Sequence, residues 1–74
     1  MLILDRAKVE AILEDNQKND RLPVNLNQVA IRAGCHRQTI YVLMDRGERA
    51  TLKDLDMLAK AMRVDVSDIV SETE

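Results

Sequence analysis

Apolar residues recur three and four positions apart along most of the chain, which is the spacing of an amphipathic α-helix. One stripe carries Val9 and Leu13, and another carries Leu55, Leu58 and Met62. The pattern predicts five helices, over residues 5–16, 26–33, 36–45, 51–62 and 66–70.

Residues that start and stop helices lie at the ends of these segments. Asp5, Asn25, Thr51 and Asp65 can each accept a hydrogen bond as an N-cap, and the last three have Gln28, Asp54 and Asp68 three positions later. In such a capping box, the later side chain reaches back to the N–H of the cap residue. Two glycines are placed as stops, with Gly34 after the second helix and Gly47 after the third.

The segments outside the helices are short. Residues 17–24 are polar, contain Pro23 and are predicted to form a loop. The apolar start, Met1–Leu4, can either pair as a short strand or simply lie on the core. The end of the chain, Ser71–Glu74, is expected to fray.

Composition supports an all-α fold in a single domain spanning residues 1–74. Hydrophobic residues make up 46% and charged residues 32%, as in a folded protein, while the chain has one aromatic residue, two glycines and one proline. No apolar stretch, the opening Met1–Leu4 included, approaches a membrane span of roughly 20 residues, so no membrane association is expected. A single cysteine, Cys35, forms no disulfide within the chain and fits a reducing cytoplasm.

Charge is unevenly distributed. The net charge is −2, yet residues 21–50 contain five arginines and only two acidic residues, Asp45 and Glu48. The segments on both sides contain more acidic than basic residues. A basic centre between acidic ends can steer one face toward an anion.

The second and third predicted helices have the sequence features of a helix-turn-helix. Gly34 separates them by a turn of about three residues, and the small Ala30 lies four positions earlier, where a larger side chain would push the helices apart. Ile40 and Leu43 are spaced to hold the second of these helices against the first.

Residues 26–43 (LNQVAIRAGCHRQTIYVL), the RGE at 46–48, the leucines and alanines of 51–62 and the VDVSDIV at 64–70 resemble the lambda-repressor/Cro-like (Xre-type) DNA-binding family. The resemblance covers roughly residues 7–70. It implies a compact five-helix lambda-repressor-like domain whose third helix enters the major groove of double-stranded DNA. It also implies a nucleoid-associated transcriptional regulator, a repressor that binds as a dimer.

The resemblance and the outward face of residues 36–45 point to base-contacting residues. Arginine can donate two hydrogen bonds to guanine, glutamine can pair with adenine, and valine can contact a thymine methyl group. A purely solvated helix face is the alternative for the charged and polar members. The predicted base contacts are His36, Arg37, Gln38, Tyr41 and Val42.

Two of these residues have specific alternatives. His36 lies at the N-cap position of its helix, so it can cap the helix or contact DNA. Tyr41 can lie over its own helix and contact nothing.

Contacts to the DNA backbone are expected from the start of the second helix, whose free N–H groups attract phosphate, and from the region past the third helix. Asp45 and Glu48 would repel DNA, so they are expected to pair with neighbouring arginines. The predicted phosphate contacts are Asn25, Asn27, Gln28, Thr39, Arg46 and Arg49.

Other function classes have less support. A protein-binding module, such as an antitoxin-like partner, is the alternative to DNA binding. One histidine, one cysteine and no glycine-rich phosphate loop argue against an enzyme, and no cofactor, metal or small-molecule ligand is expected. Two surfaces are candidates for self-association, the last helix (Val66, Ile69 and Val70) and the apolar start (Leu2, Ile3 and Leu4).

Overall fold

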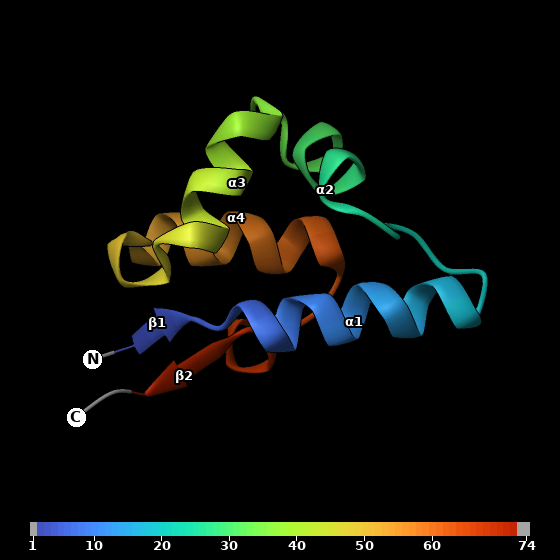
Figure 1. Ribbon diagram of the computed structural model, residues 1–74, viewed down its shortest axis with the longest axis horizontal. Coiled ribbons are helices and arrows are strands. Elements are labelled where there is room, and N and C mark those ends of the chain that lie inside the picture. Colours follow the sequence, from blue (N-terminus) through green and yellow to red (C-terminus); the bar gives the residue numbers. More distant parts are fainter. Residues whose placement is uncertain (1, 73–74) are drawn as a thin grey trace.

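Four α-helices and a two-stranded antiparallel sheet make up residues 2–72, the part of the chain that the computed structural model describes (Figure 1). Two single turns of 3₁₀-helix connect them. In chain order the elements are β1 (Leu2–Leu4), α1 (Arg6–Lys18), α2 (Leu26–Ala33), α3 (Arg37–Asp45), η1 (Gly47–Arg49), α4 (Leu52–Met62), η2 (Val66–Asp68) and β2 (Val70–Glu72).

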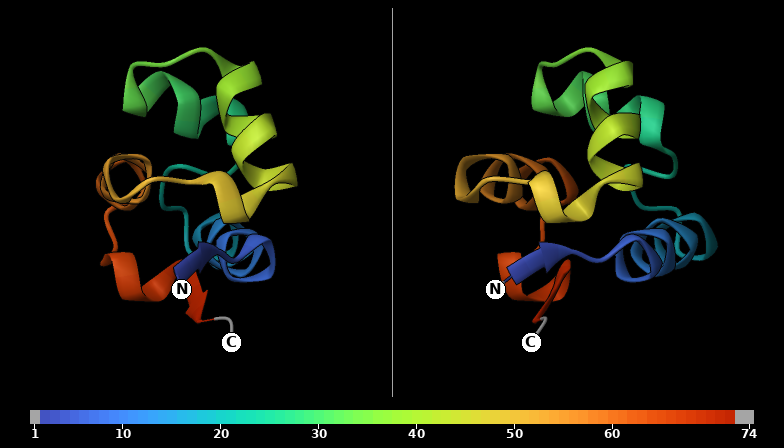
Figure 2. Two further views of the ribbon diagram at one scale, coloured as in Figure 1. Left: turned by 90° about the vertical axis from the view of Figure 1, so that its left-hand side faces the viewer. Right: turned by 60° about the vertical axis from the view of Figure 1, so that its left-hand side comes forward.

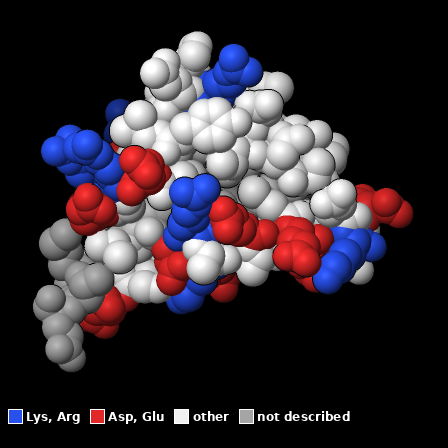
Figure 3. Space-filling model, in the orientation of Figure 1, with Lys and Arg blue, Asp and Glu red and all other residues white. Residues whose placement is uncertain are grey.

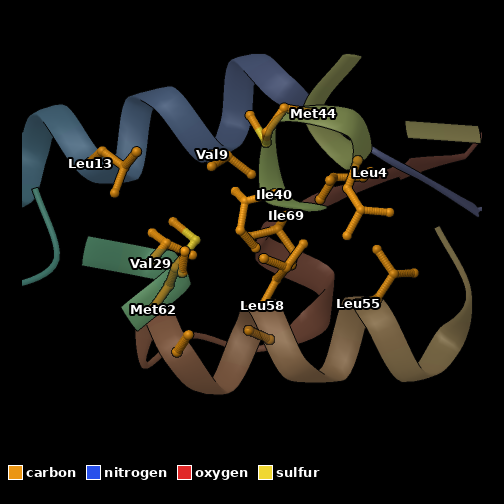
Figure 4. Packing of buried hydrophobic residues seen from close by; sticks show 14 of the residues in the cluster. Leu4, Val9, Leu13, Val29, Ile40, Met44, Leu55, Leu58, Met62 and Ile69 are labelled. Carbon is orange, nitrogen blue, oxygen red and sulfur yellow. The ribbon is translucent and has the colours of Figure 1, made fainter. Parts of the chain in front are cut away.

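The elements lie in three levels. Figure 2 shows α2 and α3 at the top, α4 beneath them, and α1 with the sheet and η2 at the bottom. Side chains from all three levels meet in one hydrophobic core, which Figure 4 shows from close by. Val29, Ile40 and Ile69, one from each of three distant segments, are fully buried there.

The end of the chain differs from its prediction. The helix expected over residues 66–70 is a single 3₁₀ turn, Val66–Asp68, after which the chain extends into β2 and pairs with β1. Two causes act together. The β-branched Val70 favours extended backbone, and the apolar start of the chain supplies a partner strand. Over residues 2–72 the fold is therefore mostly helical, as predicted, but it has four α-helices and a small sheet where five helices in an all-α domain were expected.

The sheet joins the two ends of the described chain. Leu2 lies opposite Glu72, Ile3 opposite Ser71 and Leu4 opposite Val70. The short-strand alternative for the start is thus confirmed for residues 2–4, and the expected fraying is wrong for Ser71 and Glu72. Met1, Thr73 and Glu74 lie outside the described residues.

The polar groups around the sheet are closely engaged. The Asp5 N–H donates to the Ile69 carbonyl at 2.8 Å, and the Ser71 hydroxyl donates to the Asp5 carboxylate. From α1, the Lys8 ammonium donates to the Val70 carbonyl at 2.7 Å. These bonds attach the first helix to the last strand.

The predicted helix starts are largely confirmed. The side chains of Asp5 and Asn25 accept from the N–H groups of Lys8 and Gln28, and Thr51 and Asp54 form the expected capping box. At the second helix the box differs by one residue, because the Gln28 side chain accepts from the Val24 N–H, 2.8 Å away, and not from that of Asn25.

The first helix continues to Lys18, two residues past its predicted end. The buried Asn16 explains the difference, because its amide donates to the Pro23 carbonyl at 2.9 Å and holds the following loop against the helix. The Asn16 carbonyl accepts from the Arg21 N–H at 2.8 Å and closes the turn. The polar side chain that marked the predicted end is instead part of the interior.

The two glycines have different roles. Gly34 ends α2 in the left-handed conformation, with φ 72°, as predicted. The third helix ends at Asp45 with Arg46 as its C-cap, so Gly47 lies one residue past the C-cap. A Cβ on Gly47 would lie 2.2 Å from the Leu4 carbonyl oxygen, so the missing side chain is what lets β1 pack against η1.

Candidate nucleic-acid interface

Helices α2 and α3 form the predicted helix-turn-helix arrangement. The Gly34 N–H donates to the Ile31 carbonyl, and the Cys35 N–H donates to the Ala30 carbonyl at 3.1 Å, which closes the turn between the helices. Ala30 is buried, as are Ile40 and Leu43 on the inner side of α3. The tight junction that the small residue predicts is therefore present.

The start of α3 is capped by His36. Its Nδ1 accepts a hydrogen bond from the Gln38 N–H at 3.1 Å, so the capping interpretation is confirmed. Since the imidazole is exposed, the predicted base contact is compatible with this role and stays a prediction. The adjacent Cys35 is half-buried and packs against the core, as a small apolar side chain does.

The outward face of α3 is exposed. Ile40, Leu43 and Met44 point into the core, which leaves the remaining predicted base-contacting residues of the helix at the surface. Two of them are apolar or aromatic, with Tyr41 at 46% and Val42 at 51% exposure. The five predicted base contacts all lie at the surface of this helix or its cap: His36, Arg37, Gln38, Tyr41 and Val42.

Tyr41 is tied to the neighbouring helix. Its hydroxyl donates to the Asn27 side-chain oxygen of α2 at 3.3 Å. The alternative in which this tyrosine contacts nothing was wrong. The bond crosses between the two helices on their exposed side and occupies the Asn27 oxygen, which leaves the Asn27 amide N–H groups as donors.

The predicted phosphate contacts at the start of α2 are partly occupied. The Asn25 side chain caps the helix, and the half-buried Gln28 side chain holds the Val24 N–H. Asn27 is exposed, as is Thr39 on α3. Of the predicted set on α2, Asn27 has the most accessible donor group.

The ion pairs expected after α3 are not formed. Among residues 2–72, neither Asp45 nor Glu48 lies within 4.0 Å of Arg46 or Arg49, and no carboxylate lies that close to Arg37 either. A cause is the break in the helix at Arg46, where φ is −127°, so the side chains of this segment do not follow the (i, i+4) spacing that brings charged partners together.

The ion pairs of the described residues lie elsewhere, on α1, the loop after it and α4. Figure 3 shows acidic and basic side chains alternating along the lower edge of the molecule, where α1 runs, below a broad uncharged area over α2 and α3. The pairs are Arg6–Glu10, Lys18–Glu14, Arg21–Asp15 and Lys60–Asp56. The arginines at 37, 46 and 49 are therefore available to an external anion.

Shallow hollows lie on both sides of the start of α3, so this turn stands out as a ridge. They have volumes of about 480 and 520 Å³. Sequence reasoning missed two residues here, Ile31, which is 79% exposed, and Asp54. Ile31 lies four positions after Asn27 on the same helix, so helical periodicity was the signal that could have found it. The hollows are lined by Asn27, Ala30, Ile31, Cys35, His36 and Arg37 on one side, and by His36, Gln38, Thr39, Val42, Leu43 and Asp54 on the other.

A larger hollow, of about 730 Å³, lies away from the outer face of α3. Its apolar lining comes from α1, the following loop, the end of α4 and Val64, and the exposed Leu22 stands at its margin. Arg21, Arg32 and Arg63 also line it, but Arg21 is paired with Asp15 and Arg32 donates to the Ala61 carbonyl.

Two of the three residues of the candidate self-association surface at the end of the chain are not accessible to a partner, so that prediction was wrong for them. Ile69 and Val70 are buried in the core, and so is Leu4 at the other end. The pairing of β1 with β2 turns these side chains inward. Val66 and Ile3 are half-buried, and Leu2 is exposed.

No helix within residues 2–72 has both the length and the apolar character that a membrane crossing requires. Over the same range, no group of three or more His, Cys, Asp and Glu side chains is arranged so that it could hold a metal ion.

Comparisons of the chain with protein-family models, with curated proteins and with solved structures found no match.

Proposed function

We propose that this protein is a sequence-specific regulator that binds double-stranded DNA, with α3 in the major groove. The observation that carries the proposal is the helix-turn-helix whose outer face is exposed and whose arginines at 37, 46 and 49 have no carboxylate partner among residues 2–72. Phosphate groups are the partners that such cations meet on DNA.

The roles of the residues follow from their positions. Arg37 and Gln38 stand in the first turn of α3, where they can reach base edges. Asn27, Thr39, Arg46 and Arg49 contact the DNA backbone on either side. Membership of the lambda-repressor/Cro-like family and a role as a repressor belong to this proposal.

One copy presents a single nine-residue recognition helix, which reads too few base pairs for specificity in a genome. We therefore infer that two copies bind a two-fold symmetric site, with half-sites about 34–36 Å apart.

Selection from a pool of randomised duplexes at near-physiological salt tests the proposal. We expect the protein to enrich an inverted repeat. Retention without any preferred sequence would contradict specific recognition.

Three variants then separate the roles of the cations. Arg37→Ala is expected to cost about 1–3 kcal/mol on the selected site and little on random DNA, because a base contact is lost. Arg49→Ala is expected to weaken binding to every duplex alike and to lower the slope of log K against log salt by about 0.9. Lys60→Ala is the matched control, because Lys60 is already paired with Asp56 at 3.0 Å. Equal losses from Arg37→Ala on selected and random DNA would contradict base reading.

A protein-binding module is the second candidate, favoured by the 730 Å³ hollow, whose lining combines apolar and charged side chains. In that case the outer face of α3 has no role with DNA. This candidate would be favoured if the protein did not bind the duplex pool, or if its affinity for the duplexes did not change with salt concentration.

A further inference from the structure

Val42 is an apolar side chain exposed in the middle of the outer face of α3. It is 51% exposed, while the inner positions of the same helix are filled by Ile40, Leu43 and Met44. The core therefore does not need its side chain, and the exposed part of Val42 is available to a partner.

The neighbours of Val42 on this face are uncharged apart from Asp45 on the same helix and Asp54, which lines the adjoining hollow. Gln38 lies four residues earlier, directly in line along the helix, and Tyr41 lies beside it. The tyrosine hydroxyl is held by Asn27, so its ring leans toward α2. Gln38 and Val42 therefore lie one turn apart on the exposed side of the helix, with Arg37 next to Gln38.

The major-groove edges of the four base pairs carry one apolar group, the 5-methyl group of thymine. An exposed valine in the groove complements that group and offers nothing to hydrogen-bond donors or acceptors. Gln38 offers both a donor and an acceptor, which is the pattern that matches adenine.

The distance along the helix limits where these two bases lie. Four residues of α-helix span about 6 Å, and base pairs are about 3.4 Å apart. The thymine met by Val42 therefore lies one or two base pairs from the adenine met by Gln38.

We infer that each half-site contains a thymine recognised through its 5-methyl group by Val42, one or two base pairs from an adenine recognised by Gln38. This inference depends on the DNA binding proposed above. It makes Val42 a specificity-determining residue that carries no charge and no hydrogen-bonding group.

The experiment removes the methyl group without changing base pairing. A site is first selected from randomised duplexes, and each thymine in it is then replaced in turn by deoxyuridine. At one position per half-site, we expect the affinity to fall about fourfold, as for one buried methyl-sized group. Deoxyuridine outside the half-sites is expected to have no effect.

A protein variant assigns the effect to one side chain. Val42→Ala is expected to bind the thymine duplex about fourfold more weakly than the unchanged protein does and to bind the deoxyuridine duplex equally well. Leu22→Ala is the matched control, because this leucine is 59% exposed but lies in the loop after α1. It is expected to keep the full difference between the two duplexes.

Each of the other possible results would contradict one specific part of the inference or of the proposed function. If deoxyuridine at every thymine leaves the affinity for the selected site unchanged, methyl reading is wrong, while the selected site still supports the proposed function. If Val42→Ala keeps the fourfold difference, another residue reads the methyl group. If no sequence is selected at all, the proposed function fails, and the inference fails with it.

Discussion

The two ends of the molecule use their polar groups differently. In the terminal layer, formed by α1, β1, η2 and β2, charged side chains bind one another or the backbone, as Lys8 does with the Val70 carbonyl and Arg6 with Glu10. In the helix-turn-helix layer, Arg37 has no carboxylate partner among residues 2–72, and Val42 is half exposed. In the terminal layer these charged groups are bonded within the molecule, whereas the helix-turn-helix layer presents an unpaired arginine and an apolar side chain to the solvent.

This difference explains how a chain with a net charge of −2 can present unpaired arginines to an external anion. Four carboxylates of α1 and α4 are paired with cations of the same region or the adjoining loop, and the three pairs of α1 and its loop lie at the opposite side of the molecule from α2 and α3. Local charge and its distribution, more than net charge, decide what a surface attracts. We therefore expect substitutions in the terminal layer to change stability, and substitutions on the outer face of α3 to change DNA binding.

The largest effect is expected from Ile69→Asp. This side chain is 0% exposed, so the variant must bury a carboxylate among aliphatic groups. The cost of burying an unpaired charge exceeds the roughly 3–5 kcal/mol that a core of this size supplies. We expect loss of the helical circular dichroism signal at 25 °C. Ser67→Asp, at an exposed position two residues earlier, is expected to stay folded.

A folded Ile69→Asp protein with altered oligomeric state would contradict the burial of this residue and would restore the end of the chain as a self-association surface.

A smaller effect is expected where the two layers meet. Gly47→Ala places a Cβ 2.2 Å from the Leu4 carbonyl oxygen, so backbone must move, at a cost of about 3 kcal/mol. Gly34→Ala meets nothing within 4 Å, but it strains a residue at φ 72°, at about 1 kcal/mol. Thermal melting compares them, at about 4–8 °C per kcal/mol for a domain of this size. A larger loss from Gly34→Ala would mean that β1 does not pack closely on η1.

The smallest effect concerns acid. The hydrogen bond from the Ser71 hydroxyl, and next the Lys8 N–H, hold the pKa of Asp5 below its ordinary value of 3.8. A carboxyl whose pKa is lowered on folding stabilises the protein above pH 3.8, and this contribution is lost as the pH falls through the lowered value. At pH 7 we expect Ser71→Ala to have a lower melting temperature than the unchanged protein. We expect this difference in melting temperature to narrow progressively below pH 3.8.

Ser67→Ala is the control for the acid experiment, because Ser67 is exposed and lies outside the contact with Asp5. If the difference in melting temperature between Ser71→Ala and the unchanged protein is the same at pH 7 and at pH 3, the hydrogen bond from Ser71 to Asp5 does not have this role. DNA affinity at pH 7 is expected to be the same for both serine variants, because both residues belong to the terminal layer.

The helices could be predicted because each combines several local signals. Residues 26–33 have an N-cap, helical periodicity and a glycine stop, and α2 has these bounds in the structure. The strands could not be assigned in the same way. Three residues are too few to show a two-residue period, and the partners at 2–4 and 70–72 are brought together only by the complete fold.

The site was predictable to a similar extent. Periodicity identified the outer face of α3, including Gln38 and Val42, from the positions of Ile40 and Leu43. The bond from Tyr41 to Asn27 depends on how closely α2 and α3 approach, which local spacing does not define. The missing ion pairs of Asp45 and Glu48 follow from the break at Arg46. Gly47 indicated that the helix stops here, but it did not define how the chain turns after the stop.

The contact between Lys8 and the Val70 carbonyl also affects how the molecule meets other copies of itself. Because the Asp5 N–H bonds to the Ile69 carbonyl, the alternation of an antiparallel pair turns the Val70 carbonyl away from β1, toward the open edge of the sheet. An open edge is a template for edge-to-edge aggregation, and a lysine placed on it is a common protection. Here the ammonium occupies the carbonyl itself, so an incoming strand meets a positive charge where it would need an acceptor.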